Sequence, residues 1–168
     1  VSILCGGLAG WQRDELPLQE GNVELPEGEF DAAFTSEAVV RVTDVLLASH
    51  EKSAQIVDAR PAARFNAEVD EPRPGLRRGH IPGALNVPWT ELVQEGELKT
   101  TDELDAIFFR HGVSFDRPII ASCGSGVTAA VVVLALATLD VPDVTLYDGA
   151  WSEWGSRTDL PVEPADAK

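Results

Sequence analysis

Residues 118–136 read PIIASCGSGVTAAVVVLAL, and this stretch decides the fold. An apolar run over 118–122 stops directly before Cys123, and a second apolar run over 127–139 follows a pair of glycines. The first run has the length of a buried strand, and the second has the length of a buried helix. We therefore predict a strand, a tight glycine turn that carries Cys123, and then a helix.

Further apolar runs and helical spacings surround this stretch. They alternate along the chain, and strands separated by helices indicate an α/β fold with a parallel sheet and helices on both faces. In such a sheet, ligands bind beyond the carboxyl ends of the strands. The Cys123 turn follows one of those ends, so we expect a functional site there. The predicted strands are 54–58, 85–87, 118–122 and 143–147, and the predicted helices are 37–49, 61–68, 89–93, 102–111 and 127–139.

The glycine turn has the chemistry of an anion-binding loop. Glycines let the backbone curl tightly around the Cys123 sulfur, so that successive N–H groups point inward. The positive N-terminal end of the next helix adds to this field. Together these groups favour a thiolate over a thiol and would stabilise a persulfide anion. We predict that the persulfide-stabilising loop consists of Gly124, Ser125, Gly126, Val127 and Thr128.

Two other interpretations of Cys123 stay open at this point. A small buried cysteine can be an inert part of the core. A cysteine in such a turn also begins the phosphatase signature C-x5-R, in which the arginine clamps phosphate. The matching position here is Ala129, which disfavours a phosphatase.

The composition narrows the classes of function. The chain has 168 residues, about the size of one domain, with 13 Lys and Arg against 28 Asp and Glu and a net charge of −15. Such a charge repels nucleic acid and anionic membrane surfaces. Two cysteines make no disulfide framework, and no Cys/His cluster has metal-ligand spacing. We therefore expect a cytoplasmic protein without a metal, a membrane span or a nucleic-acid partner.

The start of the chain repeats a pattern found near its end. Residues 1–11 read VSILCGGLAGW and residues 144–154 read VTLYDGAWSEW, with valine, glycine and tryptophan at matching positions. Each copy predicts a short strand, a glycine turn and a helix. A tandem duplication explains the match, and chance similarity between two common units is the alternative. We expect residues 1–18 to be the tail of an absent first domain, 19–34 a linker, 35–162 the catalytic domain and 163–168 a frayed C-terminus.

Several segments resemble the 3-mercaptopyruvate sulfurtransferases of the rhodanese superfamily. They are CGSGVTA at 123–129, Asp58-Ala59-Arg60 followed by Arg64-Phe65, GHIPGA at 79–84 and YDGAWSEW at 147–154. The resemblance implies a rhodanese-like domain with a parallel five-stranded sheet flanked by helices on both faces. It also implies a protein with two such domains, of which only the second carries the cysteine.

The resemblance further implies roles for individual residues. Cys123 would be the nucleophile that takes sulfur from 3-mercaptopyruvate as a persulfide and passes it to a thiol or cyanide acceptor. Arg64 and Arg73 would hold the carboxylate and keto oxygen of the donor, since a guanidinium fork suits a carboxylate. Ser125 would assist proton transfer to the departing pyruvate enolate. No organic cofactor or metal is implied, and the first rhodanese domain of the same protein would be the partner.

The choice of donor leaves alternatives open. Family members that use thiosulfate carry basic residues directly after the cysteine, whereas Gly124 and Ser125 are neutral here, which favours mercaptopyruvate. A thiosulfate-using rhodanese is one alternative. A non-catalytic rhodanese-like binding module is the other, although inactive members usually lack the cysteine.

Other polar residues have structural interpretations. We expect Asp58 and Arg60 to form an internal ion pair near the site. His80 lies in the turn GHIPG, and we expect it to have a structural hydrogen-bonding role rather than to act as a base. We expect Arg77 and Arg78 to balance nearby acidic residues.

Overall fold

The computed structural model describes residues 2–33 and 35–164 and has a parallel sheet at its centre. The sheet has five strands in the order β1-β7-β6-β2-β3, and every neighbouring pair is parallel. The predicted α/β fold with a parallel five-stranded sheet is therefore confirmed. In chain order the strands are β1 (Val39–Val40), β2 (Gln55–Asp58), β3 (Leu85–Asn86), β6 (Ile119–Ser122) and β7 (Val144–Tyr147).

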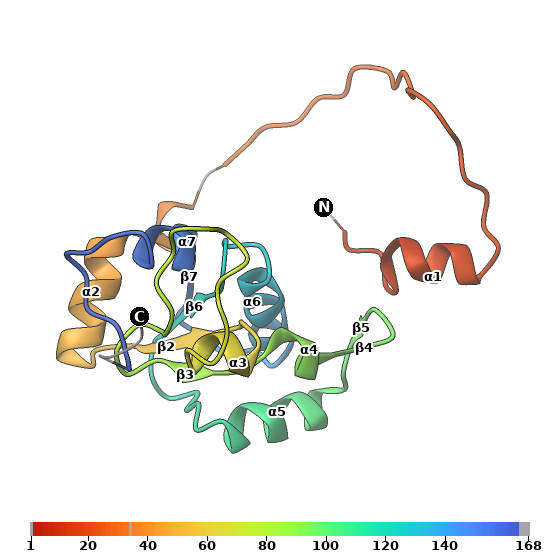
Figure 1. Ribbon diagram of the computed structural model, residues 1–168. Helices are drawn as coiled ribbons and strands as arrows, with labels where there is room; N and C mark the ends of the chain where they lie inside the picture. Colours follow the sequence, from red (N-terminus) through yellow and green to blue (C-terminus); the bar gives the residue numbers. More distant parts are fainter. Residues whose placement is uncertain (1, 34, 165–168) are drawn as a thin grey trace.

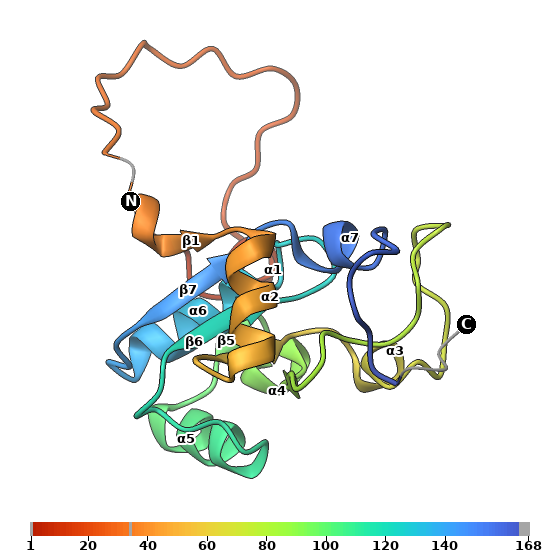
Figure 2. The same cartoon turned by 90° about the vertical axis from the view of Figure 1, so that its left-hand side faces the viewer.

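Helices cover both faces of this sheet (Figures 1 and 2). Alternate residues of a strand point to opposite faces. In β6, Ile119 and Ala121 belong to the apolar cluster that includes side chains of α5 and α6, whereas Ile120 belongs to the cluster that includes those of α2. The predicted helices on both faces are therefore confirmed. The helices of this domain are α2 (Val42–Glu51), α3 (Ala62–Phe65), α4 (Trp89–Leu92), α5 (Thr101–Arg110), α6 (Ala129–Thr138) and α7 (Ala150–Trp154).

The predicted helix over 37–49 is wrong in its first part. A 3-10 turn (Ser36–Ala38) is followed by β1, and α2 begins only at Val42. The apolar residues Val39 and Val40 pair in parallel with β7, so tertiary hydrogen bonding overrides the helical spacing. The side chain of Asp44 then accepts the N–H of Arg41 at 2.9 Å and starts the helix.

Three other helices begin at positions that differ from the predictions. Helix α3 begins at Ala62 rather than 61 and ends at Phe65 rather than 68. Helix α6 begins at Ala129 rather than 127, because Val127 and Thr128 belong to the turn, and Val127 is 73% exposed. Helix α5 begins one residue early, because Thr100 caps it with Glu103 in a reciprocal capping box.

The N-terminal segment forms the predicted helix but not the predicted strand. Helix α1 (Gly7–Arg13) matches α7 of the second copy. Residues 2–4 pair with no described segment and form no strand, since a strand needs a hydrogen-bonded neighbour. The helix lies beside the small hairpin of β4 (Val93–Gln94) and β5 (Glu97–Leu98), where a Cβ on Gly96 would meet the Gly6 carbonyl at 3.0 Å. Figure 1 shows a long arc of chain between α1 and the sheet domain.

The segments at the two ends of the predicted domain differ in how much regular structure they have. Residues 19–33 of the predicted linker are exposed and form no helix or strand. Glu163 was expected to be frayed, and that prediction is wrong, because its backbone pairs with His80 through N···O contacts of 2.7 and 2.9 Å. Residues 165–168 lie outside the described residues. The assignment of 1–18 to a first domain stays a prediction.

Within residues 2–33 and 35–164, every helix is too short or too polar to cross a membrane.

Phe108 and Phe109 are neighbours on α5 with opposite environments, at 0% and 81% exposed. We expect Phe108→Ala to lower the free energy of unfolding by roughly 3–5 kcal/mol, because it leaves a cavity in the core. The matched variant Phe109→Ala should change it by less than about 0.5 kcal/mol. Urea unfolding followed by circular dichroism measures both values. Equal losses in the two variants would contradict this orientation of α5.

Candidate active site

Cys123 lies at the carboxyl end of β6, where the neighbouring strand β2 also ends. Asp58 and Ser122 are partners in the register of the two strands, and the amide of Ala59 donates to the carbonyl of Ser122 at 2.9 Å. Cys123 itself is 1% exposed and packs among apolar residues of the cluster under α6. The thiol is therefore held at the expected edge of the sheet, below the surface.

The glycine turn leaves its amides available. No backbone carbonyl of the described residues accepts a hydrogen bond from the amides of residues 124–128. Gly126 has a φ of +83°, and a Cβ on it would meet the Asp148 carboxylate oxygen at 2.8 Å. Glycine is needed at this position both for the backbone conformation and for the close approach of Asp148. Such a turn can bind an anion through its N–H groups.

The first amides of α7 hold the cysteine turn from the other side. The amide of Trp151 donates to the carbonyl of Cys123 at 2.9 Å, and the amide of Ser152 donates to the carbonyl of Gly124 at 3.0 Å. The first N–H groups of a helix lack partners inside the helix. Here the cysteine turn supplies the missing acceptors, so α7 and the turn fix each other.

A pocket of about 290 Å³ opens beside the turn and brings most of the predicted site residues together. It is lined by Arg64 and Arg73 from one side and by Gly124, Ser125 and Thr128 from the turn. The predicted nucleophile Cys123 and the other predicted members of the loop, Gly126 and Val127, do not line it. Its lining residues are Arg60, Pro61, Arg64, Glu71, Pro72, Arg73, Leu76, Trp89, Gly124, Ser125 and Thr128.

Arg64 lies against the cysteine turn. A Cβ on Gly124 would meet its Nη2 atom at 2.8 Å, so the guanidinium lies directly against the backbone of the turn. The same guanidinium forms an ion pair with Glu71 through Nη2, and its Nε donates to Glu71 at 3.1 Å. The Glu71 side chain is almost fully buried. It therefore sets the position of Arg64.

The carboxylate of Glu71 also binds Arg60, and this link was not predicted. Arg60 donates from Nη1 to Glu71 at 2.8 Å and from Nη2 to Asp58 at 2.7 Å, and its guanidinium lies 4.4 Å from the centre of the Trp151 ring. The predicted internal ion pair of Asp58 and Arg60 is confirmed. Glu71 lies in the charged, proline-containing stretch DEPRPGLRRG over 70–79, and nothing in its spacing signals burial.

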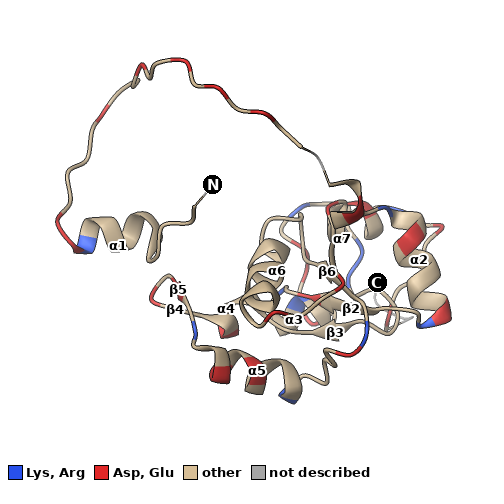
Figure 3. Cartoon of the chain, turned by 180° about the vertical axis from the view of Figure 1, so that it is seen from behind, with Lys and Arg blue, Asp and Glu red and all other residues tan. Residues whose placement is uncertain are grey.

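These contacts leave Arg73 as the arginine of the pocket without a carboxylate partner among the described residues. The buried chain Asp58–Arg60–Glu71–Arg64 pairs two carboxylates with two guanidinium groups and is neutral overall. Arg73 instead donates from Nη1 to the hydroxyl of Ser152 at 2.9 Å. Figure 3 shows acidic residues along the linker, α2 and α5, in keeping with the net charge of −15.

His80 and Arg78 have the structural roles that were expected. The Nδ1 atom of His80 lies 2.8 Å from the carbonyl of Phe65, and the two rings stack with centroids 3.7 Å apart. Arg78 pairs with Asp70 at 2.7 Å.

Arg77 lies near the acid Asp159, as expected, but its hydrogen bonds go to backbone carbonyls. Its guanidinium donates to Leu160 at 2.8 Å and to Trp154 at 3.0 Å, which fixes the end of α7. Burial lowers the pKa of Arg77, and the charge of Asp159 opposes that shift. Nearby, burial and the hydrogen bond to Glu153 raise the pKa of Tyr147, so its phenol stays neutral.

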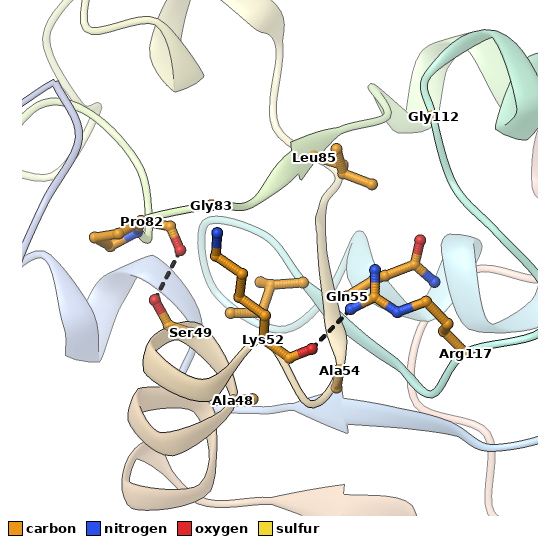
Figure 4. A pocket seen from close by; sticks show the side chains of 11 residues that line it. Ala48, Ser49, Lys52, Ala54, Gln55, Pro82, Gly83, Leu85, Gly112 and Arg117 are labelled. Atoms are coloured by element: carbon orange, nitrogen blue, oxygen red, sulfur yellow. Dashed lines mark hydrogen bonds between the residues drawn. The ribbon is translucent and has the colours of Figure 1, made fainter.

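A second pocket lies at the opposite end of β2 and is unrelated to Cys123. Figure 4 shows Ser49, Gln55 and Arg117 around it. Ser49 donates to the carbonyl of Pro82 at 2.7 Å, and Arg117 donates to the carbonyl of Lys52 at 2.8 Å, so these side chains tie backbone segments together. In the part of the chain that the structure describes, no group of three or more His, Cys, Asp or Glu side chains is placed to hold a metal.

Comparison with known proteins identifies the fold and several relatives. The model of the rhodanese-like domain matches residues 42–157. The chain is 86% identical to the 3-mercaptopyruvate sulfurtransferase of Escherichia coli K12 over 98% of its length, and 40% identical to the human protein of that name over 94%. The chain spans 58% of the E. coli relative and 53% of the human one.

A solved structure supports the same assignment. The crystal structure of the E. coli 3-mercaptopyruvate sulfotransferase SseA superposes with a TM-score of 0.79 at 84% identity. The match covers 90% of this chain and 56% of that one.

The strained glycine of the turn provides a test of the geometry. We expect Gly126→Ala to lower the free energy of unfolding by roughly 1–3 kcal/mol, because a side chain disfavours a positive φ and would press on Asp148. Gly28→Ala is the matched control, since a Cβ there meets nothing within 4 Å. Thermal and urea unfolding report the loss. An unchanged midpoint in Gly126→Ala would show that the turn has another conformation.

Proposed function

Because the chain belongs to the rhodanese-like domain family, we propose that it contains the sulfur-transfer centre of a 3-mercaptopyruvate sulfurtransferase. One observation carries the proposal: Cys123 follows β6 in a glycine turn whose amides donate to no backbone carbonyl of the described residues, and the next residues of that turn, Gly124 and Ser125, line a pocket with Arg64 and Arg73. The name of the E. coli relative supports the identity of the donor.

The first step of the proposed reaction transfers sulfur to the enzyme. The Cys123 thiolate attacks the thiol sulfur of 3-mercaptopyruvate, and a new S–S bond forms as the C–S bond breaks. The electron pair of the C–S bond goes to the carbon, which leaves as the enolate of pyruvate. A proton then converts the enolate to pyruvate. Cys123 now carries the persulfide, and the amides of residues 124–128 stabilise its anion.

The second step returns the thiolate. A cyanide ion or an acceptor thiolate attacks the outer sulfur of the persulfide, the S–S bond breaks, and its electron pair returns to Cys123. Cyanide leaves as thiocyanate, and a thiol leaves as a persulfide. The enzyme therefore alternates between two forms, which predicts ping-pong kinetics. The reaction requires no cofactor or metal.

The side chains around the pocket divide the remaining tasks. Arg73 binds the carboxylate of the donor, and Arg64 contributes the N–H groups that Glu71 leaves open. Ser125 lines the pocket and its hydroxyl is suited to pass a proton to the enolate. Single positive charge at Arg73 suits a mono-carboxylate donor better than the dianion thiosulfate, which is the alternative donor.

The wider setting is part of the proposal. The first rhodanese domain of the whole protein is its partner in the same chain, and residues 1–18 would be its tail. Both cysteines are free thiols, which supports a cytoplasmic location, where thiols stay reduced.

The competing proposal is a rhodanese-like binding module without turnover. The 1% exposure of Cys123 favours it, because a donor has to reach the sulfur below the turn. Persulfide formation distinguishes the two proposals.

Treatment with 3-mercaptopyruvate should add about 32 Da, one sulfur atom, to the chain. Cys123→Ser should abolish both this adduct and pyruvate release, because the nucleophile is absent. Cys5→Ser is the matched control and should keep both. Intact-mass spectrometry and a pyruvate assay make the measurement. Turnover that persists in Cys123→Ser would refute the nucleophile, and a wild-type chain without any adduct would favour the binding module.

The donor assignment is tested separately. We expect kcat/KM for 3-mercaptopyruvate to exceed that for thiosulfate by about tenfold or more, because neutral residues follow Cys123 and one unpaired guanidinium lines the pocket. Thiocyanate formation in the presence of cyanide measures both donors with the same assay. A higher kcat/KM for thiosulfate would replace the donor while leaving Cys123 as the nucleophile.

A further inference from the structure

Ser152 lies between the cysteine turn and Arg73, the arginine of the pocket that has no carboxylate partner in residues 2–33 and 35–164. It lies in α7, and its hydroxyl donates to the carbonyl of Gly124 at 2.6 Å. The same oxygen accepts a hydrogen bond from Nη1 of Arg73 at 2.9 Å. A serine hydroxyl has one donor hydrogen and two acceptor lone pairs, so it can make both bonds at once.

Arg73 needs such a partner to hold one position. It comes from the segment between α3 and β3, which has no helix or strand, and its side chain is exposed. Arg64, by contrast, is fixed by the buried Glu71. A free arginine side chain samples many rotamers, and ordering it on binding reduces affinity. Ser152 is the side chain to which the Arg73 guanidinium donates among the described residues.

We propose that Ser152 is a positioning residue that sets the affinity for the donor's carboxylate by fixing Arg73 relative to Gly124. This inference rests on the proposed function, in which Arg73 binds that carboxylate. Ser152 does not touch the reacting atoms in this scheme. Its effect belongs to binding, so it should change KM and leave the chemical step alone.

The chain offers a matched control for this hydroxyl. Ser156 lies four positions after Ser152, is exposed, and donates from its hydroxyl to the carbonyl of Glu153 at 2.8 Å. Ser152→Ala and Ser156→Ala each remove one hydroxyl that binds a backbone carbonyl. Only the first loses a bond to Arg73.

Steady-state kinetics with 3-mercaptopyruvate test the proposal. Ser152→Ala should raise KM roughly three- to tenfold with kcat within about twofold of wild type. Ser152→Thr, which keeps a hydroxyl, should restore most of the affinity, and Ser156→Ala should match wild type. In an Arg73→Ala background, adding Ser152→Ala should have no further effect on KM, since the two act through one contact.

Other outcomes overturn the proposal. An unchanged KM in Ser152→Ala does so, as does a fall in kcat alone, which would mean that the hydroxyl acts on the Gly124 turn. A further rise of KM when Ser152→Ala is added to Arg73→Ala also overturns the proposal, because Ser152 would then act independently of Arg73.

Failure of the proposed function is recognised independently, because wild-type protein would then transfer no sulfur from 3-mercaptopyruvate. In that event an NMR titration with pyruvate decides the role of Ser152. A dissociation constant that rises in Ser152→Ala but not in Ser156→Ala supports the role. Equal constants, or no binding to wild type, reject it.

Discussion

The site depends on the hydrogen bonds between the start of α7 and the cysteine turn. The amides of Trp151 and Ser152 donate to the carbonyls of Cys123 and Gly124. Both partners need the bond, because the first amides of a helix and the carbonyls of a curled turn lack local partners. With its carbonyls held in this way, the turn keeps the amides of residues 124–128 free of backbone acceptors. The same contact places Ser152 next to Arg73, so the start of α7 also helps to position a side chain that lines the pocket.

A buried chain of alternating charges supports the pocket from below. Arg60 joins Asp58 at the end of β2 to Glu71 in the irregular segment after α3, and Glu71 holds Arg64 beside Gly124. A buried carboxylate is stable only when it is paired and hydrogen-bonded. Glu71 meets both conditions, and it anchors a segment that has no helix or strand of its own. Because the charges of these four side chains cancel, Arg73 is the group of the pocket that attracts an anion. It does so in a protein with a net charge of −15.

Local sequence predicted the parallel sheet, its position relative to Cys123 and the presence of most helices. The prediction failed at Val39 and Val40, because strand pairing with β7 at the edge of the sheet outweighs a helical spacing that is itself correct for α2. It was incomplete at Arg77, which faces the charge of Asp159 as expected but whose guanidinium binds carbonyls at the end of α7. Glu71 and Ser152 were missed for a related reason: their partners are set by segments distant in the chain.

The sequence alone therefore determined most of the helices and strands and the place of the candidate nucleophile Cys123 at the end of β6. Apolar periodicity indicates which face of a strand or helix is buried, and two glycines after a buried strand indicate a tight turn. Both features can therefore be predicted from residues that are close together in the sequence. Only the tertiary structure decided how the turn is held and which arginine stays unpaired. Those features depend on contacts between Gly124, Arg64, Arg73 and Ser152, which belong to separate segments. Hydrogen bonds and ion pairs act over a few ångströms in space, and no short-range pattern records which segments the fold brings that close.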